Sequence, residues 1–324
     1  MSRRFGLVLG AGGGTGRAFH AGVLAALHQV AGVDARRADV IVATSAGSID
    51  GSFLRAGVGG PDLLARISRQ RVSPQAEAMF DRVPQWIDPD EEGPATGWRP
   101  ASGTRLRSLA LRPWEMRPGS VGTLFAAMMP EGRRPTRLID ETVAALHPSG
   151  WPRSPLWICT VRLDDGQRVV FGRDPGACAR PGEAAAASCA IPGYFAPVVI
   201  GGARYVDGGA HSPSNADLLV GCNLDVVIVS SPMTAAPRAL RLSPDGAFRA
   251  ACGVLLRREI ARLRRRGATV ILFEPESRDI EVMGSVSDSM AAARRERVAT
   301  RVFETVSRRL HAGRTASALQ SILA

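Results

Sequence analysis

A single serine stands among small residues in a pattern that suits nucleophilic chemistry. Ser45 follows the β-branched run at residues 40–42, and Ala43 and Gly47 lie two residues before and after it. A strand that turns sharply into a helix at a serine needs small residues at both places, because the chain passes close to itself there. The Ser45 hydroxyl would then stand clear of the sheet at a helix N-terminus, where developing negative charge is stabilised.

The usual sequence of such an elbow is G-x-S-x-G, and Ala43 replaces its first glycine. The replacement adds one methyl group where space is tightest, and we interpret it as tolerable. The alternative is an ordinary strand-to-helix turn with a capping serine, because small-x-Ser-x-Gly is frequent by chance.

A glycine-rich loop precedes this serine in the chain. Residues 5–9 predict a buried strand, residues 10–16 include five glycines, and residues 18–30 have helical spacing. Such a loop exposes backbone N–H groups at a helix N-terminus and can bind an anion. A dinucleotide site is disfavoured, because Thr15 takes the place of the last glycine of its fingerprint, and no P-loop lysine follows.

An oxyanion hole is the better interpretation of this loop. The N–H groups of Gly13 and Gly14 can approach the oxygen of a tetrahedral intermediate, because glycine has no Cβ to obstruct it. A tight packing turn is the alternative when the loop is considered alone. Residues 5–57 form one β-α-β unit, so the loop and the elbow both follow the carboxyl ends of parallel strands and can share one site.

Asp207 is the third candidate for chemistry. Residues 196–200 and 204–206 predict a hairpin around a two-glycine turn, and the hairpin leads into Asp207 and two further glycines. An aspartate followed by glycines can approach another loop closely, although the usual role of such an aspartate is in the turn itself. A catalytic triad would need His211, four residues further on, whereas His20 is expected to be a packing or capping residue.

The rest of the sequence predicts one α/β domain over residues 1–324. Residues 59–155 are rich in proline and predict an insertion of short helices and loops after the elbow. The insertion would act either as a lid that contacts lipid through residues 124–129 or as a flap packed permanently on the core. Further strands are predicted at residues 156–161, 168–171, 225–230 and 269–273, and further helices at 136–146, 181–191, 251–265 and 290–310.

The charge of the chain is strongly positive. All 41 basic residues are arginine, 30 residues are acidic, and the formal net charge is +11. This balance suits phosphates, anionic membranes or nucleic acid, although a solvated surface is the favoured interpretation for most of the arginines. The six arginines within residues 257–266 allow peripheral contact with an anionic membrane, with a solvated helix face as the favoured alternative. No aromatic residues alternate with them to stack bases, so no nucleic-acid partner is expected.

Cysteine and histidine usage gives no sign of a metal or cofactor. The five cysteines are odd in number and form no C-x-x-C pair, which favours reduced thiols, and the five histidines have no metal-ligand spacing. Glycines interrupt the apolar N-terminal run too early for a signal peptide, and no apolar stretch is long enough to span a bilayer. We expect a cytoplasmic protein that can also bind membranes peripherally.

Taken together, the motifs resemble those of the patatin-like phospholipases. The resemblance rests on the glycine loop, the Ser45 elbow, the A-S-C-A-I-P segment at residues 187–192 with the following F-A-P, and Y-V-D-G-G at residues 205–209. These motifs occur in the same order over about residues 5–217. The resemblance implies a three-layer α/β fold with a central, mostly parallel sheet, and a lipid or acyl-ester substrate.

The resemblance also implies a catalytic dyad without histidine. Ser45 is expected to be the nucleophile, Asp207 the general base, and Gly12, Gly13 and Gly14 the oxyanion loop. Many members have arginine directly after G-G-G-x, where this chain has glycine and then Arg17, so Arg17 receives no role. We therefore expect a serine lipid acyl hydrolase of the phospholipase A or esterase type. The alternatives are an acyltransferase or thioesterase with the same dyad, and a catalytically silent lipid-binding regulator.

Overall fold

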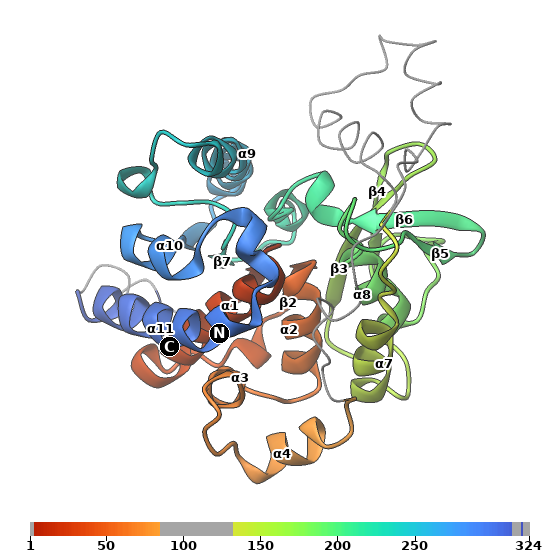
Figure 1. Cartoon of the computed structure of the whole chain (residues 1–324), viewed down its shortest axis with the longest axis horizontal. Helices are drawn as coiled ribbons and strands as arrows, with labels where there is room; N and C mark the ends of the chain where they lie inside the picture. The colour runs from red at the N-terminus through yellow and green to blue at the C-terminus, as the bar shows by residue number, and fades with distance from the viewer. Residues whose placement is uncertain (1–2, 85–131, 313–318, 320–324) are drawn as a thin grey trace.

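The computed structural model describes residues 3–84, 132–312 and 319 (Figure 1). Strands and helices alternate along much of the chain. The strands are β1 (Phe5–Leu9), β2 (Val40–Thr44), β3 (Leu156–Arg162), β4 (Arg168–Phe171), β5 (Val198–Ile200), β6 (Ala203–Asp207), β7 (Val226–Ser230) and β8 (Thr269–Phe273). The helices are α1 (Gly13–Ala31), α2 (Ala46–Arg55), α3 (Gly60–Ile67), α4 (Pro74–Phe80), α7 (Arg137–Leu146), α8 (Pro181–Ser188), α9 (Pro244–Arg265), α10 (Ser277–Met283) and α11 (Arg295–His311).

One sheet organises the described part of the chain. Its strands follow the order β5-β6-β3-β2-β1-β7-β8, and β4 pairs with β3. Five consecutive strands of the sheet, β3, β2, β1, β7 and β8, run parallel to one another. At the other side of the sheet, β4, β5 and β6 make antiparallel pairs. The predicted α/β fold with a central, mostly parallel sheet is therefore confirmed.

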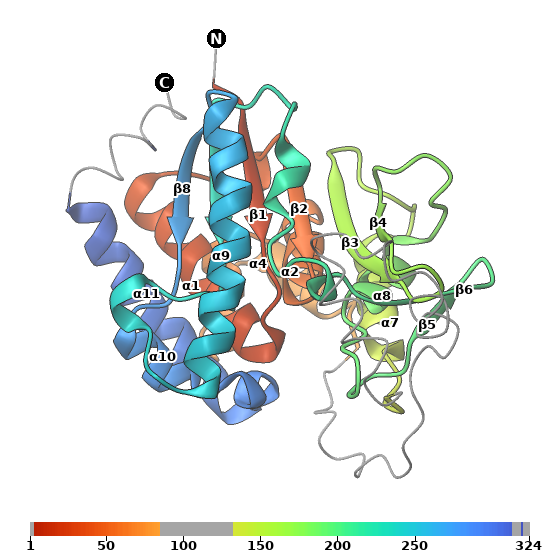
Figure 2. The ribbon, with the colours of Figure 1, turned by 90° about the horizontal axis from the view of Figure 1, so that it is seen from above.

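Helices cover both faces of the sheet and complete three layers. The helix α9 crosses one face, and α1, α2 and α11 pack on the other (Figure 2). The strands β1, β2 and β7 are buried along their whole length. Parallel strands covered on both faces need continuous apolar sequences, which explains their β-branched runs. The polar exceptions, Thr44 and Ser230, stand at the carboxyl ends, where they make side-chain hydrogen bonds.

Predicted and observed boundaries differ mainly at helix starts. The helix α1 begins inside the glycine loop at Gly13, and α9 begins at Pro244, seven residues before the prediction. Ser243 explains the earlier start of α9, because its hydroxyl accepts a hydrogen bond from the Gly246 N–H (3.0 Å) and so caps the helix. The helix α11 begins later than predicted, since residues 286–294 form 3₁₀ turns, and α10 was not predicted.

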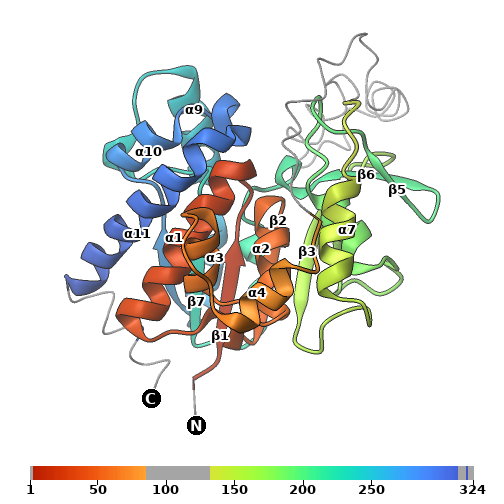
Figure 3. The same cartoon turned by 60° about the horizontal axis from the view of Figure 1, so that its bottom comes forward.

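Short helices occupy both ends of the predicted insertion. Figure 3 shows α3 and α4 on the side of α1 and α2 that faces away from the sheet. Residues 124–129, the predicted lipid contact of a lid, lie outside the described residues, so the single domain and the lid stay predictions. Within the described ranges, no helix has both the length and the apolar character needed to cross a bilayer.

The close approach of α2 to β1 yields a prediction about Gly47. A Cβ at this helical glycine would overlap the carbonyl oxygen of Leu9. We expect Gly47→Ala to lower the free energy of unfolding by about 1–3 kcal/mol, because the helix or strand must shift to admit the methyl group. Chemical denaturation monitored by circular dichroism measures this change.

Gly253 in α9 provides the matched control. The nearest atom to a Cβ placed there is a guanidinium nitrogen of Arg257 at 3.8 Å. Gly253→Ala should raise stability by up to about 1 kcal/mol, through helix propensity alone. Equal effects of the two substitutions would contradict the close approach of α2 to β1.

Candidate active site

The backbone at Ser45 adopts a conformation that few residues other than glycine accept. Its φ is 53° and its ψ is −119°, at the junction between β2 and α2. The Ser45 N–H donates to the hydroxyl of Ser188 (2.9 Å), and the Ser45 carbonyl accepts from the N–H (2.8 Å) and hydroxyl (2.7 Å) of Ser48. These hydrogen bonds hold the strained turn and fix the direction of the Ser45 side chain.

Gly47 and Ala43, the small residues on either side of Ser45, contact different parts of the structure. Gly47 lets α2 lie against the Leu9 carbonyl, so a side chain there is excluded. Ala43 is fully buried, and its methyl group lies 3.5 Å from where a Cβ would stand on Gly51. The Ala43 methyl group, which departs from the usual elbow sequence, therefore fits into the core beside Gly51.

Asp207 lies at the end of β6, and its carboxyl group is close enough to the Ser45 side chain for that side chain to lower its pKa. Its Oδ1 also accepts a hydrogen bond from the Gly209 N–H (2.7 Å). Burial raises the pKa of Asp207 to about 6, although the Ser45 side chain and the Gly209 N–H act to lower it. Of the residues that the structure describes, none forms an ion pair with Asp207. The carboxylate is therefore a stronger base than an aspartate in water.

Two strand ends on either side of β3 must meet to form this contact. The sheet places β3 between β2, which leads into Ser45, and β6, which leads into Asp207. The chain crosses the middle of β3 at Gly208, where a Cβ would overlap the Cys159 carbonyl oxygen. Ser188 bridges the same place, because its hydroxyl donates to that carbonyl (2.7 Å) while accepting from Ser45. Gly208 and Ser188 thus bring the two side chains together.

The loop after Asp207 is tied to the elbow by Asn215. Its φ is 52°, and its side-chain amide donates to the Thr44 hydroxyl (3.1 Å) and the Ser212 carbonyl (2.6 Å). Thr44 directly precedes Ser45, so this contact couples the positions of the two candidate catalytic residues. The sequence had given no sign of Asn215, because a single asparagine in a loop does not reveal a partner 171 residues away.

A buried carboxylate anchors the same loop to α9. Glu259 accepts hydrogen bonds from the hydroxyls of Ser212 and Ser214 (2.6 Å each) and from the Ala216 N–H (2.9 Å). Burial raises the pKa of Glu259, and the three hydrogen bonds oppose the shift. Glu259 thus holds the loop that positions Asp207 without touching the cavity.

Gly13 and Gly14, at the start of α1, line a cavity together with Ser45. The first N–H groups of a helix have no acceptors within the helix, so they are suited to bind an oxyanion. Gly12 does not line this cavity; it packs against Pro232, where a Cβ would lie 2.7 Å from the ring. The structure therefore brings two of the three predicted loop glycines to Ser45.

The two histidines considered in the sequence lie apart from the Ser45–Asp207 contact. His20 is buried, and its Nε2 donates to the Gly10 carbonyl (2.8 Å) while its Nδ1 accepts from the Ser230 hydroxyl (2.7 Å). Burial lowers the pKa of His20 to about 4, so a neutral ring fixes the base of the glycine loop. In the described part of the chain, no hydrogen bond joins His211 to Ser45 or Asp207.

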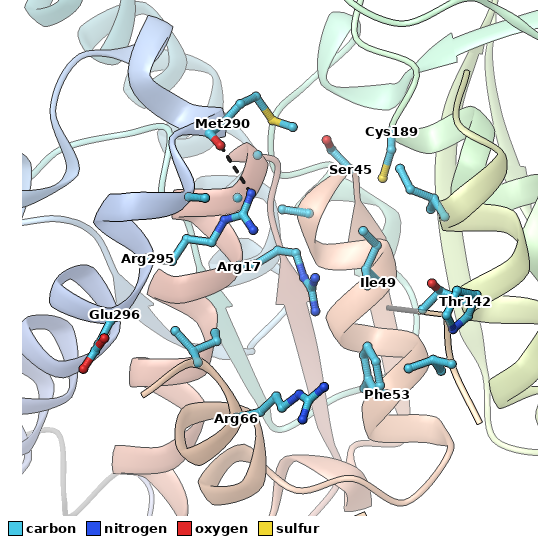
Figure 4. A pocket seen from close by; sticks show the side chains of 18 of the residues that line it. Arg17, Ser45, Ile49, Phe53, Arg66, Thr142, Cys189, Met290, Arg295 and Glu296 are labelled. Carbon is cyan, nitrogen blue, oxygen red and sulfur yellow. Dashed lines mark hydrogen bonds between the residues drawn. The ribbon is translucent and has the colours of Figure 1, made fainter. Parts of the chain in front are cut away.

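The cavity has a volume of about 490 Å³ and extends from Ser45 between α2, α3, α4 and α7. Figure 4 shows Ile49 and Phe53 below Ser45 on one wall, facing Arg17 and Arg66. Its largest apolar contributors are Ile49, Phe53, Ile67, Phe80, Ile139, Ile191, Phe195 and Met290. An apolar cavity beside a candidate nucleophile is suited to an acyl chain.

Arg17 helps to form the wall of this cavity. Its Nε lies 3.0 Å from Oδ1 of buried Asp50, and its guanidinium lies 5.8 Å from the centre of the Phe53 ring. Burial raises the pKa of Asp50 to about 6, although the charge and hydrogen bond of Arg17 oppose the shift. Arg17, which the sequence had left without a role, therefore connects α1 to α2 beside Ser45.

The comparison with family models identifies a family for this chain. A sequence model of the family described as Patatin-like phospholipase matches residues 7–220. Among solved structures, VipD from Legionella pneumophila is 11% identical with a TM-score of 0.42, and the match covers 96% of this chain and 67% of VipD. Human GIVD cytosolic phospholipase A2 in complex with methyl gamma-linolenyl fluorophosphonate is 13% identical with a TM-score of 0.39, and the match covers 99% of this chain and 60% of that protein. No match was found among curated proteins.

The raised pKa of Asp207 yields a prediction about stability. Its ordinary pKa of 3.8 rises to about 6 in the fold, so the folded protein binds the proton more tightly and loses stability as the pH rises between these values. Asp207→Asn removes the buried charge and should raise the free energy of unfolding at pH 8 by about 1–3 kcal/mol. Denaturant titrations at pH 8 measure the difference.

Asp217 provides a matched control, because its pKa is shifted in the opposite direction from that of Asp207. Burial acts to raise its pKa, but the hydrogen bonds and charge of Arg168, whose Nη1 lies 2.7 Å from Oδ1, outweigh burial and lower the pKa. Asp217→Asn should therefore decrease stability at the same pH, because it leaves Arg168 without its ion-pair partner. A decrease in both variants would refute the account of Asp207 as a buried charge without an ion-pair partner.

Proposed function

The chain belongs to the patatin-like phospholipase family, and from this premise we propose that it is a serine lipid acyl hydrolase with Ser45 and Asp207 as its catalytic dyad. The family match confirms the predicted class of enzyme, a hydrolase of lipid esters. The observation that most strongly supports the dyad is the buried position of Asp207 beside Ser45, where the pKa of the Asp207 carboxyl is raised to about 6. A base with a pKa near the working pH is effective in proton transfer.

The proposed reaction proceeds through an acyl-enzyme. The Ser45 oxygen attacks the carbonyl carbon of the ester as its proton passes to Asp207. When the tetrahedral intermediate collapses, the leaving alcohol takes that proton from Asp207, and the acyl group stays on Ser45. Water then attacks the acyl-enzyme, with Asp207 as its base. The second collapse releases a carboxylic acid and returns the proton to Ser45.

The glycine loop would stabilise the charge that develops on the carbonyl oxygen. Gly13 and Gly14 line the cavity beside Ser45 and lie at the start of α1, so their N–H groups are the proposed donors. Each donor of this kind contributes on the order of 3 kcal/mol to the stabilisation of the transition state. Gly12, predicted as a third member, would act by packing against Pro232 and shaping the turn.

The substrate we propose is a phospholipid or another acyl ester whose chain enters the apolar cavity. The arginine-rich surface of α9 would make peripheral contact with an anionic membrane. The acyl-enzyme would also serve an acyltransferase or thioesterase, because only the acceptor or the leaving group differs. The presence of Ser45, Asp207 and the glycine loop argues against a catalytically silent lipid-binding regulator.

Labelling with a fluorophosphonate probe tests the dyad. We expect the probe to modify Ser45, as located by peptide mass spectrometry, and Ser45→Ala to abolish the adduct. Asp207→Asn should slow labelling about 10²–10⁴-fold, the range for loss of a general base. His211→Ala should label at the rate of the unchanged protein. Labelling at another serine, or loss of labelling in folded His211→Ala, would exclude the proposed dyad.

A further inference from the structure

Exposed apolar side chains gather on one segment of the surface. Of the residues that the structure describes, five large apolar side chains are exposed, and four of these lie within residues 240–254. Leu242 is fully exposed, and Phe248 and Val254 keep 44% and 51% of their surface in contact with solvent. We use the name apolar tip for Leu240, Leu242 and Phe248. A cluster of exposed apolar residues is typical of an interaction surface.

The topology places the apolar tip on the edge of the sheet that carries the active site. The helix α9 connects the parallel strands β7 and β8, so it must begin near their carboxyl ends and return to their amino ends. Figure 2 shows α9 starting at the end of the molecule toward which β8 points, away from the N-terminus. Ser45 follows β2 at the same carboxyl edge, so a partner bound at the tip lies along the edge of the sheet that carries Ser45.

The apolar tip is held firmly by its surroundings. Asp245 accepts from the Val286 N–H (2.7 Å) and pairs with Arg249 (2.9 Å). Buried Arg249 donates in turn to the carbonyls of Pro232 (2.9 Å) and Thr234 (3.2 Å). The Ser243 cap fixes the start of the helix. The exposed leucines are therefore presented by an anchored turn, and the loop cannot easily collapse to bury them.

Positive charge predominates in the segment that carries the tip, and the Glu281 carboxylate of α10 pairs there with Arg241 (2.7 Å). Residues 233–266 contain nine arginines and two acidic residues, Asp245 and Glu259, and both carboxylates are hydrogen-bonded within the protein. The helical spacing of Phe248, Ala251, Leu255, Arg258 and Arg262 puts them on one face of α9, apolar near the tip and basic beyond it. Exposed apolar groups beside arginines match the acyl region and the anionic headgroups of a lipid bilayer.

We propose that the apolar tip inserts into an anionic lipid bilayer and docks the protein with the carboxyl edge of its sheet facing the membrane. Leu242 and Phe248 enter the acyl boundary, and the exposed Arg238 beside them reaches the headgroup phosphates. The inference rests on the proposed lipid hydrolase function, because docking in this orientation delivers an ester to Ser45. It goes beyond the general basic character of α9, since it assigns the contact to three apolar residues.

Vesicle binding tests the proposal. The protein is sedimented with vesicles of equal parts phosphatidylglycerol and phosphatidylcholine, and with vesicles of phosphatidylcholine alone. We expect binding to the anionic vesicles and an affinity at least about tenfold weaker for Leu242→Asp/Phe248→Asp, because charged groups replace the inserted side chains. The matched control is Val199→Asp on β5, which substitutes the remaining exposed apolar residue at the opposite side of the sheet and should bind as the unchanged protein does.

A soluble short-chain ester separates failure of docking from failure of the enzyme. Both aspartate variants should hydrolyse it at the unchanged rate and melt at the unchanged temperature. Equal vesicle binding by Leu242→Asp/Phe248→Asp and the unchanged protein would overturn the docking proposal, as would no binding to anionic vesicles. A dimer in size-exclusion chromatography that only the tip variant disrupts would also overturn it, because a second copy would then cover the tip. Failure of the unchanged protein to hydrolyse any ester would instead contradict the proposed function.

Discussion

The contact between Ser45 and Asp207, closed away from solvent over the middle of β3, is the constraint on which the rest of the structure depends. The two residues end strands that are not neighbours in the sheet, so the chain must cross an intervening strand. The crossing is possible because Gly208 has no side chain to meet the Cys159 carbonyl. The same carbonyl receives the hydroxyl of Ser188, which in turn holds the backbone of Ser45.

The surrounding structure offsets a site that is unfavourable by itself. Ser45 has a strained backbone, and burial raises the pKa values of both Asp207 and Asp50 to about 6. Hydrogen-bond networks keep these groups in place: Asn215 joins the Asp207 loop to β2, and Glu259 ties that loop to α9. Continuous apolar cores on both faces of the sheet stabilise the fold and offset the unfavourable free energy of such a site.

The sequence predicts those parts of the molecule that local backbone physics determines. Small residues around Ser45 and the glycines before α1 reveal sharp turns, and β-branched runs reveal the buried strands. Asp207 was identified through its hairpin and the family resemblance. The contacts that complete the site were not predictable, because Ser188 reaches Ser45 across 143 residues and Asn215 reaches Thr44 across 171. The ion pair of Arg17 with Asp50 likewise arises from the packing of two helices.

The pH dependence of kcat/KM for a soluble ester tests the central claim most directly. This parameter reports the ionisation of the free enzyme. If the buried carboxylate of Asp207 is the base, activity should rise with pH through one ionisation with a midpoint of about 6, and the profile should be the same in His211→Ala. A profile that stays flat through this range, or a midpoint that disappears in His211→Ala, would contradict a Ser45–Asp207 dyad.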